Sequence, residues 1–96
     1  MIEIYVLEGC PYCNNALSLL KNSNKKYKKI VVSSSKKDYY KKRHNMETFP
    51  QILIKSKKMY VTLGGNSDLM KAFEILDLHS TSNISNEALY LFLEEK

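Results

Sequence analysis

Residues 2–13 of this chain, IEIYVLEGCPYC, decide its fold. The run from residue 2 to residue 7 is almost continuously apolar, which predicts a strand at the centre of a sheet. Glu8 and Gly9 then form a turn. Pro11 suits the first position of a helix, because a missing N–H group costs nothing there. We therefore expect Cys10 to lie at the start of a helix that directly follows the strand.

Strand and helix patterns alternate along the rest of the chain. In order, we expect a helix that ends at 21–24, a strand over 27–32, a helix over about 36–45, strands over 50–54 and 59–63, and a helix that ends before 79. The order β-α-β-α-β-β-α predicts an α/β fold. Its core is a four-stranded mixed sheet with flanking helices, in which parallel strands come first and a hairpin later.

The helix boundaries have candidate caps. Ser33–Ser35 can cap the second helix, and Asn66 or Ser67 can cap the third. Residues 79–83 are expected to form a polar loop. Residues 85–95 are expected to form a last helix, with a strand as the alternative for the second half of that segment.

Length and composition narrow the class of protein. The chain has 96 residues, so we expect a single domain over 1–96, with 79–96 as a loop and C-terminal extension. No apolar run approaches the ~18–20 residues that cross a bilayer, and the first residues lack a signal-peptide pattern. Two cysteines three positions apart cannot be the framework of a secreted mini-protein. These features favour a cytoplasmic protein without a membrane partner.

The net charge of +5 is concentrated in the middle of the chain, where residues 21–58 hold 13 Lys and Arg against two acids. Such a block could contact nucleic acid or an acidic partner. Only one of these cations is an arginine, and no nucleic-acid motif frames the nearby tyrosines, so we expect no specific nucleic-acid binding. We favour a solvated basic face that attracts small anions or acidic proteins.

Cys10 and Cys13 lie where a strand gives way to a helix. The unpaired N–H groups and the positive dipole of a helix start favour the thiolate of Cys10 over its thiol. The thiolate is the species that attacks disulfides. Cys13 lies one turn further along, close to Cys10 but shielded by the helix, so it can resolve a mixed disulfide from inside. Pro11 stiffens the turn that holds the two sulfurs.

A pair of cysteines at this spacing can also serve a zinc site or a structural disulfide. A structural zinc site needs four ligands, and the chain adds only His44 and His79, which are 35 positions apart. A purely structural disulfide would close a very small loop and stabilise little. We therefore expect redox chemistry and no bound metal.

Three motifs in this order, CPYC at 10–13, TFPQ at 48–51 and GGNSDL at 64–69, resemble those of the dithiol glutaredoxins of the thioredoxin superfamily. The resemblance extends to about residue 78 and implies a thioredoxin-like fold and a glutaredoxin-type thiol–disulfide oxidoreductase. It implies Cys10 and Cys13 as catalytic residues, with Pro11, Tyr12 and Pro50 as active-site support. The residues that it implies for glutathione binding are Tyr12, Thr48, Phe49, Pro50, Gln51, Gly65, Asn66, Ser67 and Asp68.

The resemblance also implies how glutathione, the co-substrate, would lie. A cis peptide bond at Pro50 would present the backbone of Phe49 to the cysteinyl part of glutathione. Helix amides after Gly65 would take the α-carboxylate, Asp68 would pair with the ammonium, and Gln51 would meet the glycyl carboxylate. Residues 66–68 could equally be ordinary helix caps, and both roles can hold together. Leu7 is a departure, because many relatives have a lysine there.

The resemblance implies a monomer that acts on disulfide-containing or glutathionylated proteins, with ribonucleotide reductase as one client class. Two alternatives stay open. One is a thioredoxin-like electron donor that a flavoprotein reductase recycles. The other is a module that binds an iron–sulfur cluster with glutathione as ligand, for which Pro11 is unfavourable.

Overall fold

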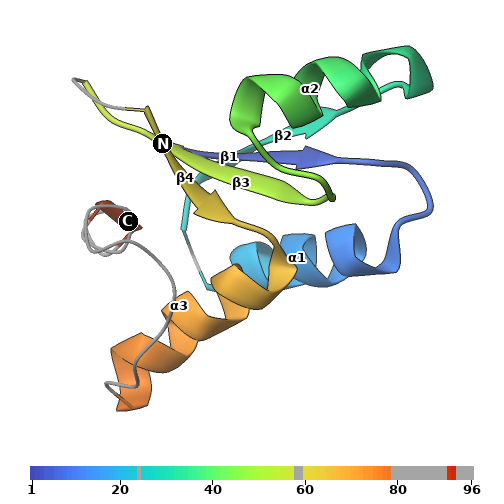
Figure 1. The fold of residues 1–96 in the computed structure, drawn as a ribbon. Helices are drawn as coiled ribbons and strands as arrows, with labels where there is room; N and C mark the ends of the chain where they lie inside the picture. Colours follow the sequence, from blue (N-terminus) through green and yellow to red (C-terminus); the bar gives the residue numbers. More distant parts are fainter. Residues whose placement is uncertain (24, 58–59, 79–90, 93–96) are drawn as a thin grey trace.

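The computed structural model describes residues 1–23, 25–57, 60–78 and 91–92. A four-stranded sheet in the order β2-β1-β3-β4 forms its centre (Figure 1). The strands are β1 (Ile2–Val6), β2 (Tyr27–Val31), β3 (Gln51–Lys55) and β4 (Tyr60–Gly64). β1 runs parallel to β2 and antiparallel to β3, and β3 runs antiparallel to β4. The predicted mixed sheet with a late hairpin is confirmed.

Helices cover both faces of this sheet. α1 (Pro11–Asn22) and α3 (Asn66–Leu78) lie on one face, and α2 (Lys37–His44) lies on the other (Figure 1). A short 3₁₀ turn, η1 (Ser34–Lys36), precedes α2. Among the described residues, no helix is long and apolar enough to cross a membrane.

The face of the sheet toward α1 and α3 holds the apolar core. All five residues of β1 are buried, as the apolar run predicts for a central strand. Ile2 and Ile4 of β1 are fully buried on this face. α1 buries Cys13, Ala16 and Leu20 against it. The helix that starts at the cysteine motif is therefore fixed by the core itself.

The opposite face, toward α2, is polar and aromatic. The ring of Tyr5 lies 4.9 Å from that of Tyr40 and 4.6 Å from that of His44, centroid to centroid. The hydroxyls of Tyr5 and Tyr60 both donate to the carboxylate of Glu3. These hydrogen bonds explain how an acid that is only 9% exposed can lie in the central strand.

The structure corrects both predicted sets of helix caps. Ser33 precedes η1 but makes no capping hydrogen bond with its side chain, and its hydroxyl lies 3.1 Å from that of Ser35 instead. α3 already begins at Asn66, so Asn66 and Ser67 lie within the helix. The loop predicted at 79–83 and most of the helix predicted at 85–95 lie outside the described residues, although Leu91 and Phe92 are helical.

Candidate active site

Cys10 is the N-cap residue of α1, and Pro11 holds the first helical position as predicted. The Cys10 backbone is extended (φ −90°, ψ 112°), and its sulfur accepts the Cys13 N–H at 3.2 Å. The first turn of α1 contains no acidic residue. The Cys10 sulfur therefore lies at the start of α1, where the first N–H groups of the helix have no partner within it. Cys10 is partly exposed, so a substrate can reach it.

Cys13 has a different environment. Its side chain is fully buried. Burial, together with the hydrogen bond to Cys10, raises the pKa of the Cys13 thiol to about 12. Cys13 therefore keeps its proton at neutral pH while Cys10 is the accessible sulfur. Both cysteines are free thiols in this structure.

The loop before β3 reaches over Cys10. The Phe49–Pro50 peptide bond is cis, as the family resemblance implies. The Cys10 thiol lies 3.9 Å from the Phe49 carbonyl oxygen, within reach of a weak S–H···O hydrogen bond. The loop and the start of α1 thus meet at the reactive sulfur.

The start of α3 closes the other side of the site. The carboxylate of Asp68 accepts the Gly65 N–H at 2.9 Å. Asn15 of α1 donates to the side-chain oxygen of Asn66 at 2.9 Å and so joins the two helices. Gly64 has φ +135°, and a Cβ built on it would collide with the Asp68 carboxylate. The absence of a side chain at Gly64 therefore leaves space for the Asp68 carboxylate at the start of α3.

These elements enclose a groove of about 340 Å³ beside Cys10. Its wall combines the active-site turn, the loop before β3 and the start of α3. Eight of the residues predicted to bind glutathione line it, together with Met46: Tyr12, Thr48, Phe49, Pro50, Gly65, Asn66, Ser67 and Asp68. Tyr12 stands at its edge with 67% of its surface exposed. Segments that are far apart in the sequence thus meet at one place.

Gln51 is the predicted binding residue that the structure does not bring to the groove. Its side chain is fully buried, and its Oε1 lies 2.8 Å from His44 Nδ1. Because side chains alternate along a strand, Gln51 points away from the groove that Pro50 lines. An interior side chain held by α2 cannot meet a glycyl carboxylate in the groove.

Met46 is the groove residue that the sequence did not single out. It follows Asn45, which ends α2 in the left-handed conformation with φ 53°. An asparagine after a lysine-rich helix is a sequence signal for such an ending. No motif in the sequence, however, indicates that the next residue turns toward the cysteine.

The different environments of the two thiols predict different reactivity. In the folded, reduced protein at neutral pH, iodoacetamide is expected to alkylate Cys10 and to leave Cys13 unmodified. The pKa of Cys13, raised to about 12, leaves almost no thiolate, and its full burial excludes the reagent. Timed labelling followed by peptide mass mapping measures both rates, with urea-unfolded protein as the control. Similar rates for the two cysteines in the folded protein would contradict this description.

Substitution of Gly64 is expected to destabilise the fold. Gly64→Ala is expected to lower the free energy of unfolding by about 2–3 kcal/mol, because it adds backbone strain and a collision with Asp68. Gly9→Ala is the matched control, since Gly9 has φ +69° but open space around it, and it should cost only about 1 kcal/mol. Urea unfolding measures both variants. Equal losses would show that the contact with Asp68 is unimportant.

Comparisons with known proteins agree with this geometry. A protein-family model described as Glutaredoxin matches residues 2–59. Glutaredoxin-1 of Gallus gallus is 33% identical over 75 residues, which cover 73% of this chain and 70% of the relative. A glutaredoxin from Brucella melitensis has a similar structure, with a TM-score of 0.59 and 29% identity over 84% of this chain and 92% of that one.

A second solved structure, of reduced Escherichia coli glutaredoxin, is similar to this one with a TM-score of 0.56 and 25% identity. The match covers 82% of this chain and 98% of the bacterial one. The groove beside Cys10, the cysteine pair at the start of α1 and these similarities lead to one conclusion: the chain belongs to the glutaredoxin family of thiol–disulfide oxidoreductases.

Proposed function

We propose that this oxidoreductase is glutathione-dependent and reduces both glutathione mixed disulfides and protein disulfides. The observation that carries the proposal is the groove beside Cys10, which eight of the nine residues predicted to bind glutathione line. We expect a tripeptide bound in this groove to place its sulfur near the partly exposed Cys10, whose sulfur lies 3.9 Å from the carbonyl oxygen of the groove residue Phe49.

The groove residues suggest how glutathione binds. The Phe49 backbone, beside Cys10, can pair with the cysteinyl part in the manner of an added strand. The first N–H groups of α3, at Asn66 and Ser67, have no partner within the helix and suit the α-carboxylate. The Asp68 carboxylate suits the ammonium group. Gln51 has no part in this arrangement, because it is buried behind the sheet.

The proposed reaction on a mixed disulfide has two exchanges. The Cys10 thiolate attacks the glutathione sulfur, the old disulfide breaks, and the protein thiolate leaves and takes up a proton. A second glutathione, as thiolate, then attacks the glutathione sulfur bound to Cys10. Glutathione disulfide is released and the Cys10 thiolate is restored, so that two electrons pass from glutathione to the substrate.

A protein disulfide needs Cys13 as well. Attack by Cys10 leaves one protein thiolate free and the other half joined to Cys10. Cys13 passes its proton to the departing thiolate as its sulfur attacks Cys10. The raised pKa of Cys13 is consistent with a sulfur that reacts only when a neighbouring disulfide is presented to it. Two glutathione molecules then reduce the Cys10–Cys13 disulfide.

The same proposal includes the compartment, the oligomeric state and the client proteins of the enzyme. We expect a cytoplasmic monomer whose clients include ribonucleotide reductase, and a single domain over residues 1–96. Size-exclusion chromatography with light scattering tests the monomer. Capture of mixed disulfides by a Cys13→Ser protein tests the clients.

Asp68 provides the test of the glutathione groove. Asp68→Asn is expected to raise the KM for glutathionylated cysteine about tenfold with little change in kcat, because one charge-assisted hydrogen bond to the ammonium is lost. A glutathione-coupled assay measures both constants. Asp38→Asn, an exposed acid of α2, is the matched control. An unchanged KM in Asp68→Asn would show that Asp68 does not bind the ammonium group of glutathione.

A further inference from the structure

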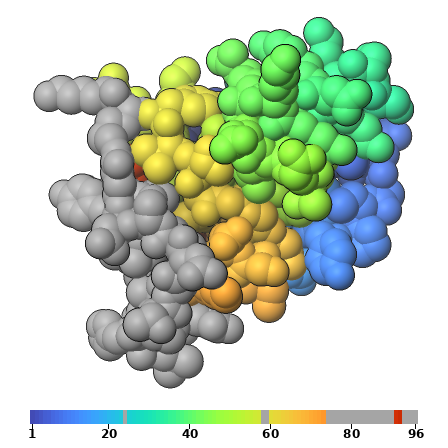
Figure 2. All heavy atoms as spheres, in the orientation of Figure 1, coloured from blue at the N-terminus to red at the C-terminus, as the bar shows by residue number. Residues whose placement is uncertain are grey.

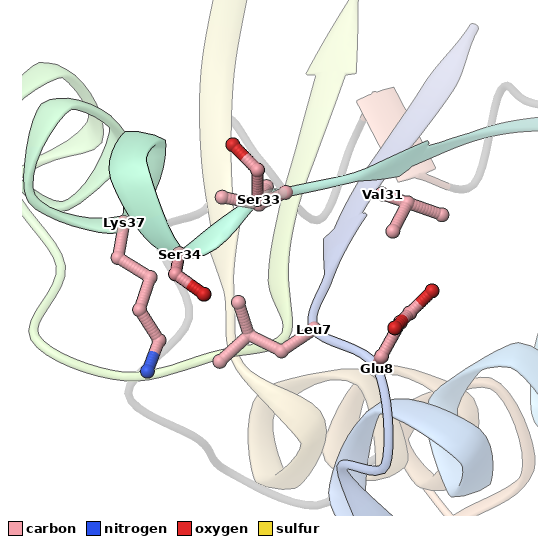
Figure 3. A pocket seen from close by; sticks show the side chains of 7 residues that line it. Leu7, Glu8, Val31, Ser33, Ser34 and Lys37 are labelled. Atoms are coloured by element: carbon pink, nitrogen blue, oxygen red, sulfur yellow. The ribbon is translucent and has the colours of Figure 1, made fainter.

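A second hollow, of about 570 Å³, lies on the other side of the active-site turn. Leu7 lies at its centre (Figure 3). The Ser34 hydroxyl points toward Leu7, and the Lys37 side chain extends on the same side of Leu7 as Ser34, whereas Glu8 and Val31 lie on the other side. Val31 is 52% exposed, although it is an apolar residue at the end of a strand. The lining of the hollow thus combines three apolar residues with two serines, one cation and one anion.

The two hollows are lined by residues on either side of Cys10 in the sequence: Leu7 and Glu8 line this hollow, and Tyr12 lines the groove. β1 leads into the Cys10 turn, and it lies between β2 and β3 in the sheet. The groove described above is on the β3 side, whereas this hollow lies where β1 and β2 end and η1 begins. A mixed disulfide has two halves. If glutathione fills the groove, the hollow on the β2 side is available to the protein half.

The surface next to this hollow is strongly basic. η1 and α2 carry five cations against the single acid Asp38: Lys36, Lys37, Lys41, Lys42 and Arg43. The side chains of α2 stand out at the surface in Figure 2 (green). Among the described residues, no acid forms an ion pair with these five cations. Lys36 instead lies 5.4 Å from the ring centre of Tyr39, which is 51% exposed.

We propose that this hollow and the basic surface of α2 form the docking site for the protein half of a disulfide substrate. The segment that fits has an apolar side chain for Leu7 and Val31, with acidic residues on the side that faces Lys37. Glu8 and the apolar centre disfavour a phosphate backbone, so the surface suits an acidic peptide better than a nucleic acid. This inference rests on the proposed function, since it assigns a place to the substrate of that reaction.

Two glutathionylated peptides test the docking site. They carry the same cysteine and a neighbouring leucine, and differ only in flanking residues, which are aspartates in one and serines in the other. The wild-type protein is expected to have about a tenfold higher kcat/KM for the acidic peptide at low salt. The ratio of kcat/KM for the acidic peptide to kcat/KM for the serine peptide should fall toward one at high salt, where the screening length is a few ångströms.

Charge-reversal variants test whether the preference for the acidic peptide depends on Lys37. Lys37→Glu is expected to abolish the preference, whereas Lys21→Glu, with the same change in net charge on α1, should keep it. Val31→Ser is expected to lower kcat/KM about fivefold for both leucine-containing peptides. The same substitution should not lower kcat/KM for control peptides in which the leucine is replaced by serine. Equal turnover of the two peptides by the wild-type protein, or an equal effect of both charge reversals, would overturn the proposal. So would displacement of the acidic peptide by an equally charged single-stranded oligonucleotide.

Glutathionylated cysteine separates this proposal from the proposed function. It carries no peptide for the hollow, so all the variants above should turn it over at the wild-type rate. Normal turnover of this small substrate without a peptide preference would refute the docking site alone. No turnover by the wild-type protein would refute the proposed function itself.

Discussion

Cys10→Ser is expected to reduce the turnover of every disulfide substrate by at least about 10³-fold. A serine hydroxyl does not ionise near neutral pH, and the structure describes no other exposed sulfur nucleophile, because Cys13 is fully buried. The variant should stay folded. Cys10 is the N-cap of α1, and serine is among the preferred N-cap residues, so its oxygen can accept the Cys13 N–H in place of the sulfur.

The measurement is a glutathione-coupled assay on glutathionylated cysteine, with urea unfolding of the same preparation. Stability equal to or slightly above that of the wild-type protein, with activity lost, is the expected pair of results. Activity close to the wild-type level would exclude Cys10 as the nucleophile. Loss of both folding and activity would contradict the N-cap description of Cys10.

Cys13→Ser should separate the two classes of substrate. Reduction of a glutathionylated substrate is expected to stay within about threefold of wild type, since the second exchange uses glutathione and not Cys13. Reduction of a protein disulfide should fall about 100-fold, because the mixed disulfide with Cys10 is no longer resolved from inside. Serine fits the position, being close to cysteine in volume where the side chain is fully buried.

Parallel assays with glutathionylated cysteine and a small disulfide protein measure this separation. Cys10→Ser serves as the reference for loss of both reactions. Equal losses with the two substrates would mean that Cys13 supports the fold or Cys10 instead of resolving a mixed disulfide. Retention of protein-disulfide reduction would mean that glutathione alone can complete that reaction.

Much of the fold could be predicted because its signals are local. The apolar run of β1 and the proline after Cys10 specify a buried strand followed by a helix start, and both are confirmed. The hairpin of β3 and β4 follows from two short apolar runs with a polar connection. The groove could be predicted only through the family resemblance, because its walls come from three distant segments.

The remaining features depend on tertiary contacts. Glu3 is tolerated in the central strand because Tyr60, 57 positions away, donates to its carboxylate. The motif placed Gln51 beside Pro50 in the groove, yet the alternation of side chains in β3 turns it toward His44. Asn66 is bonded to Asn15 of α1 instead of capping its own helix. Tyr60 and Asn15 are 57 and 51 positions from their partners, and His44 lies in a different element from Gln51, so no local pattern could indicate these contacts.

We propose that glutathione recycles the Cys10–Cys13 pair. The most direct measurement is the rate at which the oxidised protein regains two free thiols with glutathione alone, compared with NADPH and a thioredoxin reductase. We predict rapid reduction by glutathione, slowed by Asp68→Asn but not by Asp38→Asn, and little reduction by the flavoprotein. Reduction by the flavoprotein, with no reduction by glutathione, would rule out glutathione as the reductant and favour a thioredoxin-like electron donor.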